Sequence, residues 1–253
     1  MNSEKDIRLA VLIDADNIPY HTVKDILEEI AKYGTPTFKR IYGDWTKPTV
    51  IRWKNVLLEH AIMPVQQYSY TQGKNATDSA MIIDAMDILY SGKVDGFCIV
   101  SSDSDFTRLA TRLREAGMKV YGIGEKKTPN AFIVSCDKFI YIEILAEPEA
   151  DVEETTQLKV EKRKQKPSFE KLNKGDIKLI GSTIDDLADE NGWAFLGDVG
   201  NLLLKKQPNF DPRNFGFQKL TPLIKSLPQF EIDIRGTDKG GIKLVYIKNK
   251  NFG

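Results

Sequence analysis

The stretch that decides the fold of the first half of the chain is Leu9-Ala-Val-Leu-Ile-Asp-Ala-Asp-Asn17. Its apolar run suits a strand that is buried on both faces, and the run ends abruptly at Asp14. A second run, Phe97-Cys-Ile-Val100, is likewise followed by acids, Asp103 and Asp105. Both runs predict buried strands whose carboxyl ends carry carboxylates.

Strand-like and helix-like patterns alternate from these runs outward, over the first 145 residues. Such alternation predicts an α/β fold: a doubly wound, mainly parallel sheet with helices on both faces. We expect strands at 9–13, 37–42, 65–70, 97–101, 118–123 and 139–145, and helices at 19–33, 48–60, 75–90 and 105–116.

The two acidic strand ends are predicted to meet at one edge of the sheet. In a doubly wound sheet, functional groups gather outside the carboxyl ends of the strands, where the strand order reverses. If the first and fourth strands are neighbours at that point, Asp14 and Asp103 converge, with Asp16, Asn17 and Asp105 beside them. The candidate site is therefore a cluster of carboxylates.

Asp78 is expected to join this cluster through the helix that it begins. At about 100° per residue, one face of helix 75–90 carries Asp78 together with apolar side chains. Because that face must cover the sheet, Asp78 lies over the sheet edge rather than in solvent. Asp84 and Asp87 fall on other faces, where we expect solvated carboxylates. The apolar residues of the covering face are Met81, Ile82, Ala85 and Leu89.

Binding of a divalent metal is the chemistry that suits such a cluster. Clustered carboxylates repel one another and burial raises their pKa, whereas a hard cation removes this conflict. Mg²⁺ takes oxygen ligands at about 2.0–2.1 Å, and such a metal activates water and clamps phosphate oxygens, which suits phosphodiester hydrolysis. The alternative is that the acids only cap helices, as Asp105 would at an N-cap, but capping explains one acid at a time.

Composition narrows the choice of metal and of cell compartment. Neither Cys98 nor Cys136 belongs to a zinc spacing, and two histidines are too few to complete one, so oxygen atoms must hold any metal. No apolar run approaches the roughly 20 residues that span a bilayer, and residues 1–8 lack the apolar core of a signal peptide. We therefore expect a cytoplasmic protein without membrane contact. The net charge is zero and argues neither for nor against nucleic acid.

The alternating pattern ends near Glu147. Residues 148–167 turn from acidic to basic and lack aromatic side chains, which is typical of a flexible charged linker. Its basic stretch, 162–166, is either solvated or in contact with phosphates. We therefore expect one domain at 1–147, the linker at 148–167, and a second domain at 168–253.

The second domain is expected to be a small winged helix of mixed α and β structure. Amphipathic patterns predict helices at 177–190, 197–206 and 214–227, with a short apolar link at 193–196. Residues 230–235 and 242–248 alternate at period two around a glycine-rich turn, which predicts a hairpin. Three helices followed by a hairpin outline a winged helix.

The acidic motifs resemble those of a known family. Ile13-Asp-Ala-Asp-Asn17, Lys74-Asn-Ala-Thr-Asp78 and Val100-Ser-Ser-Asp-Ser-Asp-Phe106 are similar to the three signatures of NYN domains, which belong to the PIN-like nuclease superfamily. Gly122-Ile-Gly-Glu-Lys-Lys-Thr-Pro129 and Cys136-Asp-Lys-Phe139 look like the LabA-like branch of that family. The resemblance covers about residues 5–145 and implies a PIN-like fold. It also implies that the metal-binding, catalytic acids are Asp14, Asp78, Asp103 and Asp105, with Asn17 as an auxiliary polar group.

The second domain resembles the LOTUS (OST-HTH) winged-helix domain over about residues 168–248. The segments that carry this resemblance are Gly197-Asp-Val-Gly-Asn-Leu202 and Phe217-Gln-Lys-Leu220. LOTUS domains are linked to RNA binding, and some of them to protein partners. The resemblance therefore implies RNA, expected to be single-stranded, or a protein as the partner of this domain.

Basic and aromatic residues near the acidic edge are candidate RNA contacts. A first group follows the second strand, where it suits stacking on unpaired bases and binding of phosphates: Trp45, Lys47 and Arg52. The alternative for this region is a solvated surface with Trp53 packed in the core. A second group lies in loops that we expect near the acids: Lys74, Lys126 and Lys127.

Three functions are consistent with these patterns. The first is a ribonuclease that depends on Mg²⁺ or Mn²⁺ and whose C-terminal domain recruits RNA. The second is an RNA-binding regulator that keeps the metal pocket without cleaving RNA. The third is a phosphatase of the haloacid-dehalogenase type, in which Asp14 and Asp16 would form the nucleophile pair. The presence of all four acids favours the ribonuclease over the regulator, and the segments after Asp16 fit the NYN signatures better than the phosphatase.

Overall fold

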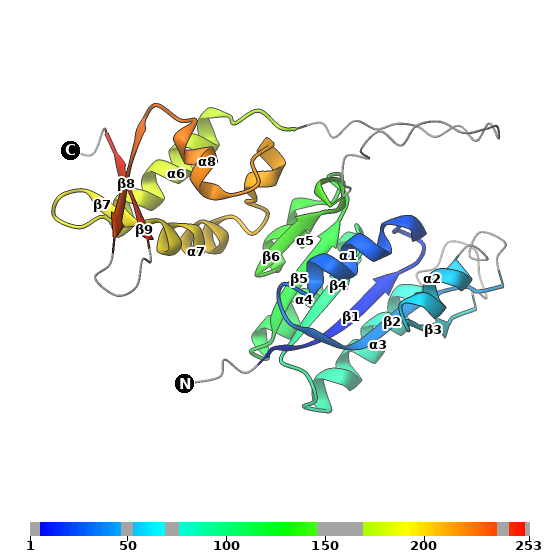
Figure 1. The fold of residues 1–253 in the computed structure, drawn as a ribbon. Coiled ribbons are helices and arrows are strands. Elements are labelled where there is room, and N and C mark those ends of the chain that lie inside the picture. The colour runs from blue at the N-terminus through cyan, green and yellow to red at the C-terminus, as the bar shows by residue number, and fades with distance from the viewer. Residues whose placement is uncertain (1–5, 47–52, 69–75, 146–168, 237–242, 251–253) are drawn as a thin grey trace, which may run out of the picture. The chain divides into compact units, whose positions relative to one another are not determined.

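The computed structural model describes residues 6–46, 53–68, 76–145, 169–236 and 243–250 (Figure 1). The chain divides into two compact units, residues 1–147 and 148–253, and each is described by itself. The expected linker, 148–167, lies outside the described residues.

The first unit is built on a six-stranded sheet in which every strand pairs in parallel with its neighbours. The strand order is β3-β2-β1-β4-β5-β6. Its strands are β1 (Arg8–Asp14), β2 (Thr35–Gly43), β3 (Met63–Gln66), β4 (Gly96–Val100), β5 (Lys119–Gly124) and β6 (Lys138–Tyr141).

β1 and β4 are neighbours, with Val11 opposite Cys98, which meets the condition under which Asp14 and Asp103 are expected to converge. The strand order reverses at this pair, because β2 and β3 extend to one side of β1 while β5 and β6 extend to the far side of β4. The carboxyl ends of β1 and β4 therefore flank the crevice in which doubly wound sheets place their functional groups.

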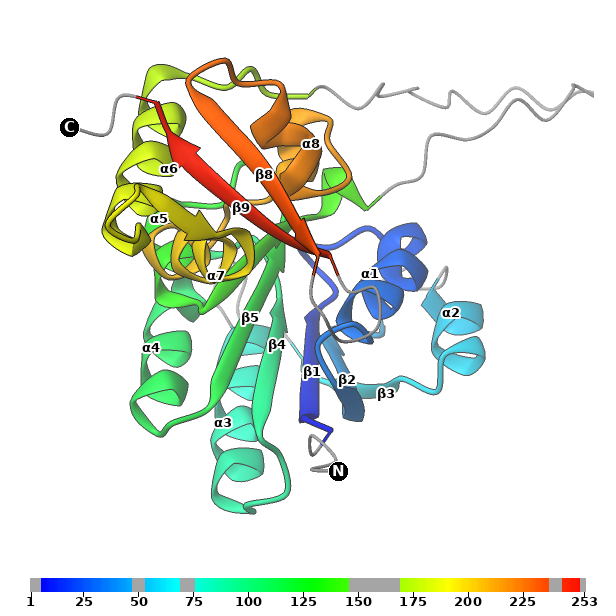
Figure 2. The same ribbon diagram turned by 60° about the vertical axis from the view of Figure 1, so that its left-hand side comes forward.

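Helices cover both faces of this sheet (Figure 2). Alternate residues of β1 serve the two faces. Val11 and Ile13 pack in the core that includes α1, whereas Ala10 and Leu12 pack in the core that includes α3 and α4. None of the described helices is long and apolar enough to cross a membrane. The helices are α1 (Val23–Ile30), α2 (Trp53–Glu59), α3 (Ala76–Tyr90), α4 (Thr107–Glu115) and α5 (Asn130–Ser135).

Three segments of the first unit differ from the prediction. The helix α5 was not expected, because its six residues are too few to show helical periodicity. The last predicted strand ends at Tyr141, and residues 142–144 form the 3₁₀ turn η4 (Ile142–Ile144). β3 begins two residues before the predicted strand, at Met63, and residues 69–70 lie outside the described chain.

β5 packs tightly against its surroundings because it carries two glycines. A Cβ atom added at Gly122 would lie 2.5 Å from the ring of Phe139, and one added at Gly124 would lie 2.5 Å from the carbonyl oxygen of Ser101. Both distances are too short for any side chain. Glycine at 124 thus allows the segment after β4 to lie against β5, where the amide of Ser101 donates to the carbonyl of Ile123 at 3.0 Å.

The second unit packs three helices against a three-stranded antiparallel sheet of order β7-β9-β8. Its helices are α6 (Lys174–Leu187), α7 (Leu196–Lys206) and α8 (Leu220–Lys225), with the 3₁₀ turn η5 (Pro212–Phe215) before α8. Its strands are β7 (Trp193–Phe195), β8 (Phe230–Gly236) and β9 (Lys243–Asn249). The arrangement is consistent with the predicted winged helix.

Three details of this unit correct the prediction. Residues 193–195 form a strand rather than a link, because they pair with the outer side of β9. The helix predicted over 214–227 is interrupted at Gly216, whose φ of +82° lies in the left-handed region that glycine adopts without strain. α6 begins three residues earlier than predicted, because Asn173 and Asp176 form a reciprocal capping box.

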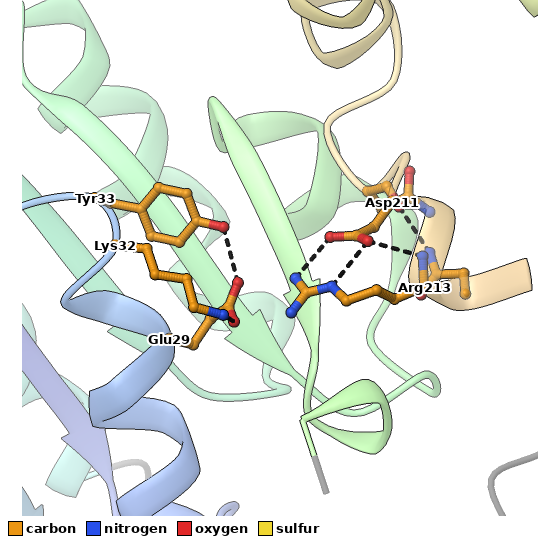
Figure 3. A network of polar contacts seen from close by, with 7 residues as sticks. Glu29, Lys32, Tyr33, Asp211 and Arg213 are labelled. Carbon is orange, nitrogen blue, oxygen red and sulfur yellow. Dashed lines mark hydrogen bonds and ion pairs between the residues drawn. The ribbon is translucent and has the colours of Figure 1, made fainter. Parts of the chain in front are cut away.

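Each unit also contains a buried acid that is neutralised from nearby in the sequence (Figure 3). In the first unit, Glu29 accepts hydrogen bonds from Lys32 Nζ at 2.7 Å and from Tyr33 Oη at 2.8 Å. In the second unit, Asp211 accepts from the guanidinium of Arg213 at 2.7 and 3.0 Å. These bonds offset the cost of burying the two carboxylates.

We expect residues 168–253 to fold as an isolated fragment with one cooperative thermal transition. The described part of this unit has an apolar core of its own, which includes the fully buried Ile184, Leu203 and Ile247. Ile247→Ala should lower the free energy of unfolding by about 2–5 kcal/mol. Circular dichroism during heating measures both effects. A fragment without a cooperative transition would contradict the expected domain boundary.

Candidate metal centre

Asp14 is the last residue of β1 and is 1% exposed. Its Oδ1 accepts the amide of Asp16 at 3.0 Å. Its Oδ2 accepts Asn17 Nδ2 at 2.6 Å and Ser101 Oγ at 2.8 Å. Two of these donors come from the turn that follows the strand, so the sequence Asp-Ala-Asp-Asn orients its own first carboxylate.

Ser101 connects the acids of the two strands. Its fully buried hydroxyl donates to Asp14 and accepts the amide of Asp103 at 3.1 Å. Sequence reasoning did not single out Ser101, although period-two alternation places it on the same face as Ile99. That alternation, together with the pairing of β1 with β4, is the signal that could have identified it.

Asp103 begins the 3₁₀ turn η3 (Ser104–Phe106) that leads into α4. Its Oδ1 accepts the amide of Asp105 at 2.9 Å, so Asp103 is the capping residue. Asp105, for which an N-cap role was the alternative, lies in the first turn instead and is exposed. Helix capping therefore accounts for one oxygen of Asp103 but not for Asp105.

Asp78 approaches the same edge from the first turn of α3. Asp78, Asp103 and Asp105 each offer a carboxylate oxygen, and these three atoms lie within 4.8 Å of one another. Oxygens on opposite sides of one Mg²⁺ are about 4.2 Å apart, given its bond length. The size of the group and its purely carboxylate donors therefore suit a hard divalent cation.

The electrostatics of Asp78 show how closely the acids are gathered. Its pKa is raised from 3.8 to about 6, first by burial and then by the charges of Asp14, Asp103, Asp105 and Asp16. Burial also raises the pKa of Asp14, while the hydrogen bonds from Asn17, Ser101 and Asp16 oppose that rise. The charged form of Asp78 is thus disfavoured unless a cation compensates it.

Three of the six candidate RNA contacts lie in the described part of the chain, and each of these three makes a contact within the protein. Trp45 is half-buried, and its indole Nε1 donates to the carbonyl of Val65 at 2.9 Å. Trp53 is 3% exposed and packs in the core, as the alternative interpretation held. Lys127 forms an ion pair with Glu125. The amide of Lys126 donates to Glu143 Oε1 at 2.8 Å. The other three candidates lie outside the described residues: Lys47, Arg52 and Lys74.

The prediction that Asp84 is solvated is wrong. Asp84 accepts hydrogen bonds from Arg40 Nη1 and Tyr42 Oη, both on β2. The buried stripe of α3 runs through Met81, Ala85 and Ile88, which is rotated from the predicted face and brings Asp84 to its border. Asp87, in contrast, is exposed as predicted.

The second unit carries an aromatic surface that sequence reasoning also missed. Cross-strand pairing places Phe195, Tyr246 and Asp233 in one row on the sheet, opposite in direction to the buried Ala194 and Ile247. The guanidinium of Arg235 lies 4.1 Å from the ring centroid of Tyr246 and 5.4 Å from that of Trp193. We call Trp193, Phe195, Arg235 and Tyr246 the aromatic face.

Comparisons with known proteins match both units. The family model of the NYN domain matches residues 8–143, and that of the OST-HTH/LOTUS domain matches residues 167–242. A search of curated proteins found no match.

Three solved structures are similar to parts of the chain. A protein of unknown function from Vibrio parahaemolyticus is 20% identical, with coverage of 56% of this chain and 96% of that one and a TM-score of 0.47. An uncharacterized protein from Nitrosomonas europaea is 28% identical, with coverage of 39% and 92% and a TM-score of 0.30. A protein fragment from Chromobacterium violaceum is 32% identical, with coverage of 30% and 80% and a TM-score of 0.25.

We expect Mn²⁺ to raise the melting temperature of the protein, and to raise it more at pH 7 than at pH 5. Because the folded-state pKa of Asp78 is about 6, Mn²⁺ must displace a proton at pH 5 but not at pH 7. Metal at 100 times its Kd stabilises the fold by about 2.7 kcal/mol. Thermal melts with Mn²⁺ or with EDTA measure the increment.

The matched variants for these melts are Asp78→Asn and Asp87→Asn, because both residues lie on α3 and Asp87 is exposed. The increment should shrink in Asp78→Asn and persist in Asp87→Asn. Equal melting temperatures with Mn²⁺ and with EDTA at pH 7, from a metal-free start, would contradict the site.

Proposed function

Because this chain belongs to the NYN domain family and continues into an OST-HTH/LOTUS domain, we propose that it is a ribonuclease dependent on Mg²⁺ or Mn²⁺. In this proposal the first domain hydrolyses RNA phosphodiesters and the second recruits the RNA. The observation that carries it is the grouping of Asp78, Asp103 and Asp105 beside the buried Asp14, at the sheet edge where the strand order reverses.

In this proposal four carboxylates would hold the metal: those of Asp78, Asp103 and Asp105, whose oxygens lie within 4.8 Å of one another, and that of Asp14, whose charge acts on Asp78. Asn17 and Ser101 orient Asp14 through the hydrogen bonds to its Oδ2. Asp105 is exposed, whereas Asp78 and Asp103 are half-buried, so a phosphodiester would reach the metal from the side of Asp105. When bound, a divalent cation supplies the positive charge that activates water and balances the phosphate.

The phosphatase hypothesis receives no support from the geometry of Asp14. A carboxylate that attacks phosphorus must present a free oxygen to its substrate. Asp14 is 1% exposed, and its two oxygens accept three hydrogen bonds between them. This arrangement suits an oriented metal ligand better than a nucleophile.

The aromatic face of the second domain supports a role in binding single-stranded RNA. Unpaired bases stack on aromatic rings and on guanidinium planes. Phe195 is 36% exposed, and the side chain of Arg235, which lies over Tyr246, is 41% exposed. Arg235 also forms an ion pair with Asp233 at 2.8 Å, in which both side chains are partly exposed. We therefore propose that RNA is recruited by stacking on the aromatic face rather than by the net charge of the protein.

We expect Asp78→Asn and Asp103→Asn each to reduce metal-dependent RNA cleavage to background while the fold persists. Each change removes a negative charge that holds the cation and keeps a carbonyl oxygen, so the cap that Asp103 Oδ1 provides can be retained. Asp14→Asn is a less suitable test, because an amide NH₂ at this position would face donors that now bond to a carboxylate.

Cleavage of labelled single-stranded RNA with Mn²⁺ or EDTA measures the effect. Asp87→Asn is the control that should retain activity, since its side chain is exposed on the same helix. Equal cleavage by wild type and Asp78→Asn would place the activity elsewhere or in a contaminant. The better interpretation would then be an RNA-binding regulator that does not cleave.

The proposed recruitment of RNA by the aromatic face predicts that substitutions of Arg235 weaken RNA binding. We expect Arg235→Ala and Arg235→Lys in the full chain both to weaken binding of single-stranded RNA, by about 1–3 kcal/mol if one base stacks there. Lysine keeps the charge but not the planar group, so a loss in both variants distinguishes stacking from simple attraction.

Fluorescence anisotropy with EDTA present measures this binding without cleavage. Full affinity in Arg235→Lys combined with a loss in Arg235→Ala would show that charge alone matters. Unchanged affinity in both variants would move the RNA-binding surface elsewhere. A wild-type protein that binds no RNA at low salt would favour a protein as the partner of this domain.

A further inference from the structure

The polar network around Asp84 joins α3 to β2. Asp84 Oδ1 accepts from Arg40 Nη1, and Oδ2 accepts from Tyr42 Oη, so both oxygens of the carboxylate are engaged. The side chains of Arg40 and Asp84 are 25% and 19% exposed, and Tyr42 is fully buried. A charge-assisted network that is largely shielded from water is stronger and more directional than a surface ion pair.

The network connects β2, which pairs with the strand that carries Asp14, to α3, which carries Asp78. Tyr42 stands opposite Asp14 in the register of β2 with β1, so the two residues are direct neighbours in the sheet. Asp84 follows Asp78 by six residues on the same unbroken helix, which corresponds to about 9 Å along its axis. Because a helix moves as a rigid unit, anchoring Asp84 to β2 also fixes the position of Asp78.

The other carboxylates of the cluster oppose this position of Asp78. The neighbouring charges of Asp14, Asp103 and Asp105 repel Asp78, and the helix can respond by sliding or rotating away from the sheet edge. The apolar contacts of α3 hold the helix against the sheet, but the hydrophobic effect is not directional, so they specify the position of Asp78 less sharply than hydrogen bonds do. They include the small Ala85 and the adaptable Met81.

We propose that Asp84 is a positioning residue for the metal centre, and that its bonds from Arg40 and Tyr42 hold Asp78 within the carboxylate cluster. The inference rests on the proposed function of that cluster as a metal site. Asp84 itself contacts neither substrate nor metal. Its loss therefore lowers affinity for the metal without removing a ligand.

Binding of Mn²⁺ to the full chain, followed by electron paramagnetic resonance, tests this directly. Asp84→Asn can keep only one of the two accepted bonds, and Tyr42→Phe removes one donor while the ring still fills the core. Each variant should weaken Mn²⁺ binding by about tenfold, as is typical when a supporting residue of a metal site is lost. Asp87→Asn, exposed on the same helix, should bind as wild type.

A metal-rescue experiment distinguishes positioning from a general loss of structure. Cleavage by Asp84→Asn should be low at limiting Mn²⁺ and return to the wild-type level at saturating Mn²⁺, whereas Asp78→Asn should not recover. If Asp84→Asn fails to fold, Tyr42→Phe carries the test, because it removes only a hydroxyl.

The outcomes separate this inference from the proposed function. Wild-type Mn²⁺ affinity in both Asp84→Asn and Tyr42→Phe overturns the positioning role and leaves the metal site intact. A wild-type protein that binds no Mn²⁺ overturns both. Weakened binding that is shared by Asp87→Asn also overturns the inference, since the effect would then come from the charge of α3 and not from the anchor.

Discussion

The repulsion among carboxylates at the end of β1 is the constraint on which the rest of this site depends. The buried Asp14 and three other acids, Asp16, Asp103 and Asp105, lie close enough to raise the pKa of Asp78, and such an arrangement persists only if the surrounding structure holds it. Hydrogen bonds from Asn17 and Ser101 hold Asp14, and the contact of Asp84 with β2 opposes the displacement of Asp78. A divalent cation would attract all of these carboxylates and so offset the electrostatic cost of bringing them together.

The sheet makes this assembly possible because it brings distant parts of the sequence to one edge. Asp14 and Asp103 end up together because β1 pairs with β4, and Ser101 bridges them through a hydroxyl that bonds to both. Gly124 contributes to this assembly indirectly, because its lack of a side chain lets the segment that carries Ser101 pack against β5. The second domain has a separate core and a separate candidate surface, so in the proposed function the recruitment of RNA and its cleavage would be divided between two domains of one chain.

Strong local patterns made much of this predictable. The apolar runs that precede Asp14 and Asp103 identify the two central strands, and the rule for doubly wound sheets places their ends together if these strands are neighbours. Features that depend on tertiary contacts were missed. The sequence pattern predicts a solvated Asp84, because Ile82 and Leu89 suggest the buried face, whereas packing rotates α3 toward Ile88. β7 is too short to be recognised without its partner β9, and the break at Gly216 depends on one backbone angle. The local sequence does not reveal such features. For this reason the pattern over 214–227 predicts one continuous helix.

The most direct measurement is X-ray diffraction from crystals soaked in Mn²⁺, recorded where manganese scatters anomalously. The account predicts an anomalous peak at bonding distance from carboxylate oxygens of the four proposed ligands, Asp78, Asp103 and Asp105 together with Asp14. The peak should disappear in Asp103→Asn crystals and remain in Asp87→Asn crystals. A well-ordered acidic cluster without any peak at saturating Mn²⁺ would contradict the claim that these carboxylates are gathered to bind a metal.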